Sequence, residues 1–69
     1  MTEMHITKVG DDLYHAEVDD TFTNIDEDVN DSQLLGMLES KRLVEGTSGG
    51  ILALLDSQHV GYEVTVTYE

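Results

Sequence analysis

The carboxyl-terminal segment of the chain carries the pattern that most constrains its fold. Apolar residues alternate there with polar residues or glycine, at Val60, Tyr62, Val64, Val66 and Tyr68. Strict alternation of β-branched and aromatic residues is typical of a strand with one buried face. The strand predicted over residues 61–68 therefore needs neighbouring strands and a second layer to cover that face.

The amino-terminal segment predicts a β-hairpin. Its two strands, residues 4–9 and 12–18, flank a turn at Gly10, which accepts the positive φ that a tight hairpin requires. Tyr14 and Val18 lie on one face of the second strand. That face is expected to turn towards the hydrophobic core.

Residues 19–30 are predicted to form an acidic loop. Phe22, Ile25 and Val29 are the large apolar residues of this segment, and they follow no clean period. A loop of this length without structure of its own is uncommon and is often functional. We therefore expect it to contribute to a binding surface.

Two helices are expected in the second half of the chain. Asn30 suits the N-cap of the first helix, and Gln33, three residues later, completes a capping-box pair. Leu34, Leu35 and Leu38 then give a stripe of apolar residues at helical spacing.

The second helix is predicted over residues 51–59, whose apolar residues also fit helical spacing. The alternative is a second hairpin, in which residues 43–44 and 51–55 pair around the intervening glycines. Alanine and leucine favour helix over strand, so the helix is the preferred interpretation.

The elements predict a single α+β domain over residues 1–69, in the order β-β-α-α-β. We expect an antiparallel-rich sheet with both helices packed on one face. The chain is short and has no cysteine, so a small core must stabilise it without disulfides. That core is predicted to contain Tyr14, Val18, Leu35, Leu38, Leu55, Val64 and Val66.

The net charge limits the function classes. The chain has 15 Asp and Glu residues against three Lys and Arg, for a formal net charge of −12 at pH 7. Such a surface repels nucleic acid and acidic membranes, whereas DNA binding needs a basic stripe. The longest apolar run, residues 51–55, is too short to span a bilayer, and the first residues lack the features of a signal peptide. We expect no direct nucleic-acid or membrane partner and a cytoplasmic location.

The sequence contains no catalytic motif, so we expect neither an enzyme nor a cofactor. An EF-hand-type calcium loop starting at Asp28 would place Gln33 where the sharp turn requires glycine. His5 and His15 fall on strands predicted to pair, where they could share a metal ion with Glu17. The preferred interpretation is that both histidines are partly exposed strand residues, and no metal site is assigned.

The acidity has two interpretations. In the first, the acids form a surface that binds the basic groove of a nucleic-acid-binding protein. This surface is predicted to contain Asp11, Asp12, Glu17, Asp19, Asp20, Asp26, Glu27, Asp28 and Asp31, a stretch without Lys or Arg. In the second, the acidity is the solvent adaptation of a salt-loving organism, and the chain is a small adaptor domain with weak cation binding. The low lysine content fits that alternative, whereas the scarcity of alanine and arginine does not.

In size, charge and lack of catalytic residues, the chain resembles the small acidic proteins by which bacteriophages block host defence. These include anti-CRISPR proteins and anti-restriction DNA mimics, and the resemblance is one of composition over the whole chain. It implies an inhibitor that occupies the nucleic-acid-binding site of a CRISPR effector or restriction enzyme in the cytoplasm of a host cell. We also expect a homodimer, because the core is small and sheet edges are available for pairing.

Overall fold

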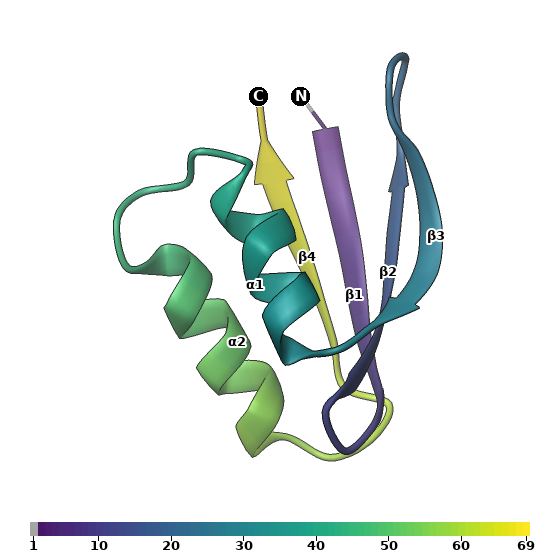
Figure 1. The fold of residues 1–69 in the computed structure, drawn as a ribbon, viewed down its shortest axis with the longest axis vertical. Helices are drawn as coiled ribbons and strands as arrows, with labels where there is room; N and C mark the ends of the chain where they lie inside the picture. Colours follow the sequence, from purple (N-terminus) through teal and green to yellow (C-terminus); the bar gives the residue numbers. More distant parts are fainter. Residues whose placement is uncertain (1) are drawn as a thin grey trace.

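Two helices lie side by side across one face of a four-stranded antiparallel sheet (Figure 1). The structure is a computed structural model that describes residues 2–69. Its elements are β1 (Thr2–Gly10), β2 (Leu13–Asp19), β3 (Asn24–Val29), α1 (Asp31–Glu39), α2 (Thr47–Ser57) and β4 (Glu63–Tyr68). The strands lie in the order β3-β2-β1-β4. The predicted α+β class, with antiparallel strands and helices on one face, is confirmed.

The amino-terminal hairpin of β1 and β2 is also confirmed, but its turn is built differently from the prediction. Positive φ occurs at Asp12, at 50°, whereas Gly10 is the last residue of β1. Aspartate tolerates the left-handed region better than most residues, so it can replace glycine in this turn. A register shift between Lys8 and Gly10 marks an irregularity just before the turn.

The predicted acidic loop over residues 19–30 is wrong for half of its length, because β3 forms an edge strand there. The element order is therefore β-β-β-α-α-β. Ile25 and Val29 turn towards the helices, opposite Val18 and Tyr14 of β2. Between them, the inward position is held by Glu27, which stays exposed at the rim. This one charged residue interrupts the alternation that would have identified the strand.

Helix α1 begins as predicted, at a complete capping box. The Asn30 side-chain oxygen accepts from the Gln33 backbone N–H at 2.9 Å, and the Gln33 side-chain oxygen accepts from the Asn30 N–H at 2.9 Å. The helix ends at Glu39, two residues before Lys41. The N-cap is therefore the feature that fixes where this helix starts.

Helix α2 excludes the alternative of a second hairpin. It begins at Thr47, four residues before the predicted start at residue 51, and ends at Ser57, before His59. Gly46 is its N-cap, with a φ of 87° that a side chain would strain. Gly49 and Gly50 lie inside the first turns of the helix, although glycine disfavours a helix and its propensity alone predicts a loop there.

The core lies between the helices and the covered face of the sheet. Its buried apolar residues are Met4, Ile6, Tyr14, Ala16, Val18, Val29, Leu34, Leu38, Leu55 and Val66. Leu34 takes the buried position predicted for Leu35, because Leu34 and Leu38 are one helical turn apart and face the sheet together. Val64 is half-buried and packs against this core. None of the helices in residues 2–69 is long and apolar enough to cross a membrane.

Candidate functional site

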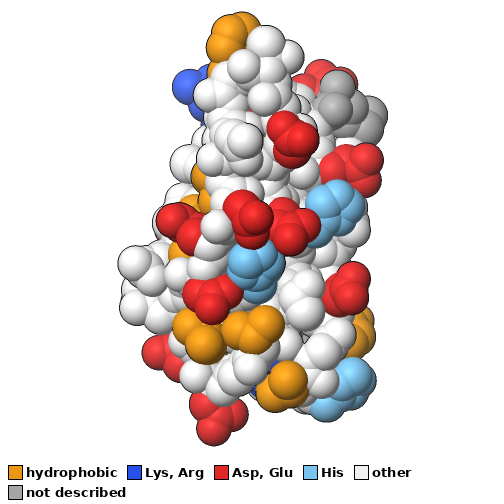
Figure 2. Space-filling model, turned by 90° about the vertical axis from the view of Figure 1, so that its right-hand side faces the viewer, with side chains coloured by type: hydrophobic (Ala, Val, Ile, Leu, Met, Phe, Trp, Pro, Cys, Tyr) orange, Lys and Arg blue, Asp and Glu red, His pale blue; other side chains and the backbone are white. Residues whose placement is uncertain are grey.

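Most acidic residues of the four strands lie on the sheet face opposite the helices. Strand register places Glu17 opposite both His5 of β1 and Asp26 of β3, and His15 opposite Asp28. We call this surface the open face, and its acidic and histidine members are Glu3, His5, His15, Glu17, Asp19, Asp26, Asp28 and Glu63. Figure 2, which views the molecule from the β3 side, shows acidic side chains gathered around histidines.

His15 is the centre of a four-residue cluster on the open face. Its Nδ1 lies 2.7 Å from Oδ1 of Asp28, and its Nε2 lies 2.6 Å from Oδ1 of Asp26. A third carboxylate, Glu17, places Oε1 at 3.4 Å from the same Nε2. The alternation of β2 puts His15 and Glu17 on one face, and the pairing of β3 brings the two aspartates to them.

Both ring nitrogens of His15 therefore face carboxylate oxygens. A neutral imidazole has only one N–H, so it donates to only one of these two aspartates. The hydrogen bond to Asp28 is the largest cause that raises the pKa of His15, and Asp26 adds to it, while partial burial opposes both. The contacts of the His15 ring with Asp26 and Asp28 tie edge strand β3 to β2.

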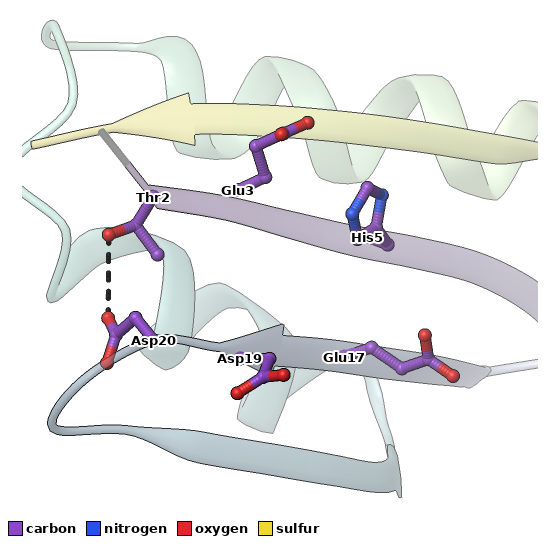
Figure 3. A pocket seen from close by; sticks show the side chains of 6 residues that line it. All are labelled: Thr2, Glu3, His5, Glu17, Asp19 and Asp20. Carbon is purple, nitrogen blue, oxygen red and sulfur yellow. Dashed lines mark hydrogen bonds between the residues drawn. The ribbon is translucent and has the colours of Figure 1, made fainter.

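A shallow pocket of about 240 Å³ lies beside this cluster, between the ends of β1 and β2 (Figure 3). Glu3 and His5 line it from β1, and Glu17 and Asp19 line it from β2. His5 Nδ1 lies 3.1 Å from the Thr65 hydroxyl of β4. The pocket is lined by four carboxylates, counting Asp20 of the following turn, so it favours a cationic occupant.

The structure divides the nine predicted partner-binding residues into two groups. Glu17, Asp19, Asp26 and Asp28 lie together on the open face. The other five lie outside the strand positions of the open face: Asp11 and Asp12 in the β1–β2 turn, Asp20 after β2 at the rim of the pocket, Glu27 on the other side of β3, and Asp31 at the start of α1.

Three of these five acids make local contacts with the backbone or with other acids. Oδ1 of Asp12 accepts the Asp31 N–H at 2.8 Å, at the start of α1. Oδ1 of Asp20 accepts the N–H groups of Phe22 and Thr23, at 2.8 and 2.6 Å, and these bonds lower the Asp20 pKa. Burial raises the pKa of Asp31, and the nearby Asp56 and Asp12 carboxylates add to that effect.

Two acids of the open face, Glu3 and Glu63, were missed in the sequence. Each alternates with apolar residues of its own strand, and that alternation was the signal that could have placed them. With them the open face has six carboxylates: Glu3, Glu17, Asp19, Asp26, Asp28 and Glu63.

All three cationic side chains lie away from the open face. Lys8 is buried on the covered face of the sheet. The ammonium group of Lys41 lies 5.0 Å from the ring centre of Tyr68, and Arg42 is exposed in the segment after α1. The described Lys and Arg side chains therefore leave the carboxylates of the open face uncompensated.

Comparison with protein-family models, curated proteins and solved structures found no match to this chain. The functional argument therefore rests on the geometry and charge of the open face.

Proposed function

We propose that the open face binds a basic surface of a partner protein, as a competitor of the nucleic acid that this surface normally holds. The observation that carries the proposal is the gathering of six carboxylates on one sheet face that has no Lys or Arg. The partner class is a nucleic-acid-binding protein, such as a CRISPR effector or a restriction enzyme in a bacterial cytoplasm. The chain acts by occupying the site and performs no chemistry there.

The spacing of a β-sheet suits this role. Same-face residues repeat about every 6.6 Å along a strand, and neighbouring strands lie about 4.8 Å apart. Carboxylates from β1, β2, β3 and β4 therefore form a two-dimensional patch. Duplex DNA has one charge per roughly 1.7 Å of its axis, a density that a single strand cannot reach but that several neighbouring strands approach.

The largest effect of such a patch is on the rate at which the two proteins meet. Complementary charge raises the rate of encounter by about 10- to 1,000-fold at low salt. After contact, carboxylates and arginine or lysine side chains form charge-assisted hydrogen bonds. Both contributions weaken with added salt, because exposed charges are screened beyond about 8 Å at physiological ionic strength.

The test is capture of partners from a bacterial lysate, followed by competition with DNA or guide RNA. We expect the captured proteins to bind nucleic acid, and expect nucleic acid or high salt to release them. The triple variant Glu3→Lys, Asp19→Lys and Glu63→Lys should slow association with a captured partner by about tenfold or more, because it reverses charges that steer the encounter. These three residues are exposed and lie outside the His15 cluster.

A matched control changes the net charge equally but elsewhere. The variant Glu27→Lys, Glu39→Lys and Glu45→Lys alters three exposed acids away from the open face. It should leave the association rate within about threefold of the parent, since only distant, screened charges change. Equal slowing by both triple variants would reject the open face as the binding surface. A chain that captures no nucleic-acid-binding protein and folds only in molar salt would instead support solvent adaptation.

A further inference from the structure

We infer that His15, Glu17 and Asp26 form a binding site for a divalent transition-metal ion, with Zn²⁺ as the probe of choice. One ligand atom from each residue lies within 4.8 Å of the other two. The inference goes beyond the proposed function and does not rest on it, because the site lies within one chain and is measured without a partner.

The distance from His15 to Glu17 already fits a metal ion, and the distance to Asp26 fits after one side chain moves. Zn²⁺ bonds of about 2.1 Å at tetrahedral angles place two ligand atoms about 3.4 Å apart. The separation of His15 Nε2 and Glu17 Oε1 is 3.4 Å. Asp26 Oδ1 is closer to Nε2, at 2.6 Å, and must move outward to make room for the ion. Its side chain is 69% exposed on an edge strand, so a rotation into solvent allows that movement.

Asp28 supplies the outer contact that a metal-binding histidine needs. Its Oδ1 lies 2.7 Å from Nδ1 of His15, on the far side of the ring from Glu17 and Asp26. An N–H on Nδ1 that donates to a carboxylate fixes the tautomer in which Nε2 has a free lone pair. Asp28 thus orients the ring and directs its Nε2 towards the other two ligands.

The pairing of β2 and β3 places the three ligand residues next to one another. His15 and Glu17 are two residues apart on β2, and Asp26 is directly opposite Glu17 on β3. The metal site considered from the sequence joined His15 and Glu17 to His5. Among residues 2–69, the group of side chains close enough to share an ion contains Asp26 instead of His5. The formation of β3 is what brings this third ligand into place.

The ligand types indicate the class of metal. Imidazole nitrogen suits Zn²⁺ and related transition metals, whereas Mg²⁺ and Ca²⁺ prefer oxygen ligands alone. Three protein ligands on a solvent-facing sheet leave at least one coordination position for water or another ligand. The net charge of −12 further favours the approach of any cation, so selectivity must come from the histidine.

The test is calorimetric titration of the purified chain with Zn²⁺, Mg²⁺ and Ca²⁺ at about pH 8, where a ligating imidazole is more readily deprotonated. We expect one Zn²⁺ per chain and much weaker binding of the other two ions. His15→Gln and Asp26→Asn should each raise the Zn²⁺ dissociation constant by about tenfold or more. Zn²⁺ should also shift the Nε2 resonance of His15 in a nitrogen-15 NMR spectrum.

Asp19→Asn is the matched control, because it removes the same charge as Asp26→Asn from the same face. It should leave the Zn²⁺ dissociation constant within about twofold, since one screened charge contributes little. Circular dichroism checks that each variant is folded, and Asp26→Asn keeps the test valid if His15→Gln loosens β3. Equal losses in Asp19→Asn and Asp26→Asn, or equal affinity for Zn²⁺ and Mg²⁺, would overturn the inference.

Discussion

At the scale of single residues, Asp31 is in the least favourable environment of the acids. One of its carboxylate oxygens is buried without a hydrogen-bond partner among the described residues. Burial raises the pKa of Asp31, and repulsion from the Asp56 and Asp12 carboxylates raises it further. Its position in the first turn of α1 is favourable for a negative charge, which offsets part of this cost.

We expect Asp31→Asn to stabilise the protein at neutral pH. The raised pKa means that the folded chain holds the Asp31 proton more tightly than the unfolded chain, so ionised Asp31 destabilises the fold above its folded pKa. That penalty disappears below the unfolded pKa of about 3.9. The gain in unfolding free energy should therefore be largest near pH 7 and shrink as the pH falls, as measured by urea denaturation.

Glu39→Gln removes a charge from an exposed position of the same helix and serves as the control. The unfolding free energy of this variant should differ little from that of the parent, both near pH 7 and at acidic pH. A variant Asp31→Asn that is less stable than the parent near pH 7 would show that the helix-dipole contribution outweighs burial and repulsion.

At the scale of elements, helix α2 is attached to the sheet by polar contacts as well as by Leu55. Lys8, 8% exposed on the covered face of β1, donates from Nζ to the carbonyl oxygens of Asp56 and Gln58, at 3.0 and 2.8 Å. The Tyr14 hydroxyl donates to the Asp56 carboxylate. Helix α2 has no basic residue in its last turn, so the sheet supplies the cation that its C-terminal carbonyls favour.

Lys8→Met should lower the unfolding free energy by about 1.5–3 kcal/mol, the usual range for hydrogen bonds to a charged group. The methionine retains most of the apolar volume but leaves two carbonyls without their donor. Urea denaturation measures the loss, and hydrogen exchange should show faster opening of the α2 amides than of the β1 and β2 amides.

The matched control is Lys41→Met, which also removes one positive charge. Lys41 lies over the Tyr68 ring, both side chains are partly exposed, and a cation–π contact near the surface contributes about 0.5–1 kcal/mol. A loss for Lys8→Met no larger than that for Lys41→Met would show that the two carbonyls are satisfied as well by water.

The sequence predicted the elements whose two faces differ clearly in polarity. It missed β3 and the start of α2, where single residues depart from the usual pattern of a strand or a helix. Val64 and Val66 revealed β4 because each alternates with a residue that faces solvent. Strand β3 was hidden by Glu27 at an inward position, and the start of α2 was hidden by two glycines in its first turns. Without β3, the approach of Asp26 to His15 could not be predicted, since it depends on strand register.

At the scale of the whole molecule, the two edges of the sheet differ. Edge strand β3 carries Asp26, Glu27 and Asp28 in succession, whereas edge strand β4 consists of Thr and apolar residues after Glu63. An edge without charges is the more available for pairing with another chain. The expected homodimer would therefore form through β4, and repulsion between two chains of net charge −12 opposes it.

Light scattering over a concentration series tests this dimer. Because salt screens repulsion between like charges, dimerisation should strengthen with added salt. Partner binding by the open face should weaken under the same conditions, so the two associations respond in opposite directions. A mass near 7.7 kDa at every concentration and salt level would exclude the dimer.

The exposed Glu27 at an inward position of β3 would also limit any assembly of copies through their sheet edges. A chain that pairs at both sheet edges can add copies without limit and grow into a fibre. An inward-pointing charge on an edge strand prevents such addition, since pairing would bury it beneath the new strand. Here one edge has that protection and the other does not. Two copies joined through β4 would present only protected edges, so we expect Glu27 to prevent the addition of a third copy.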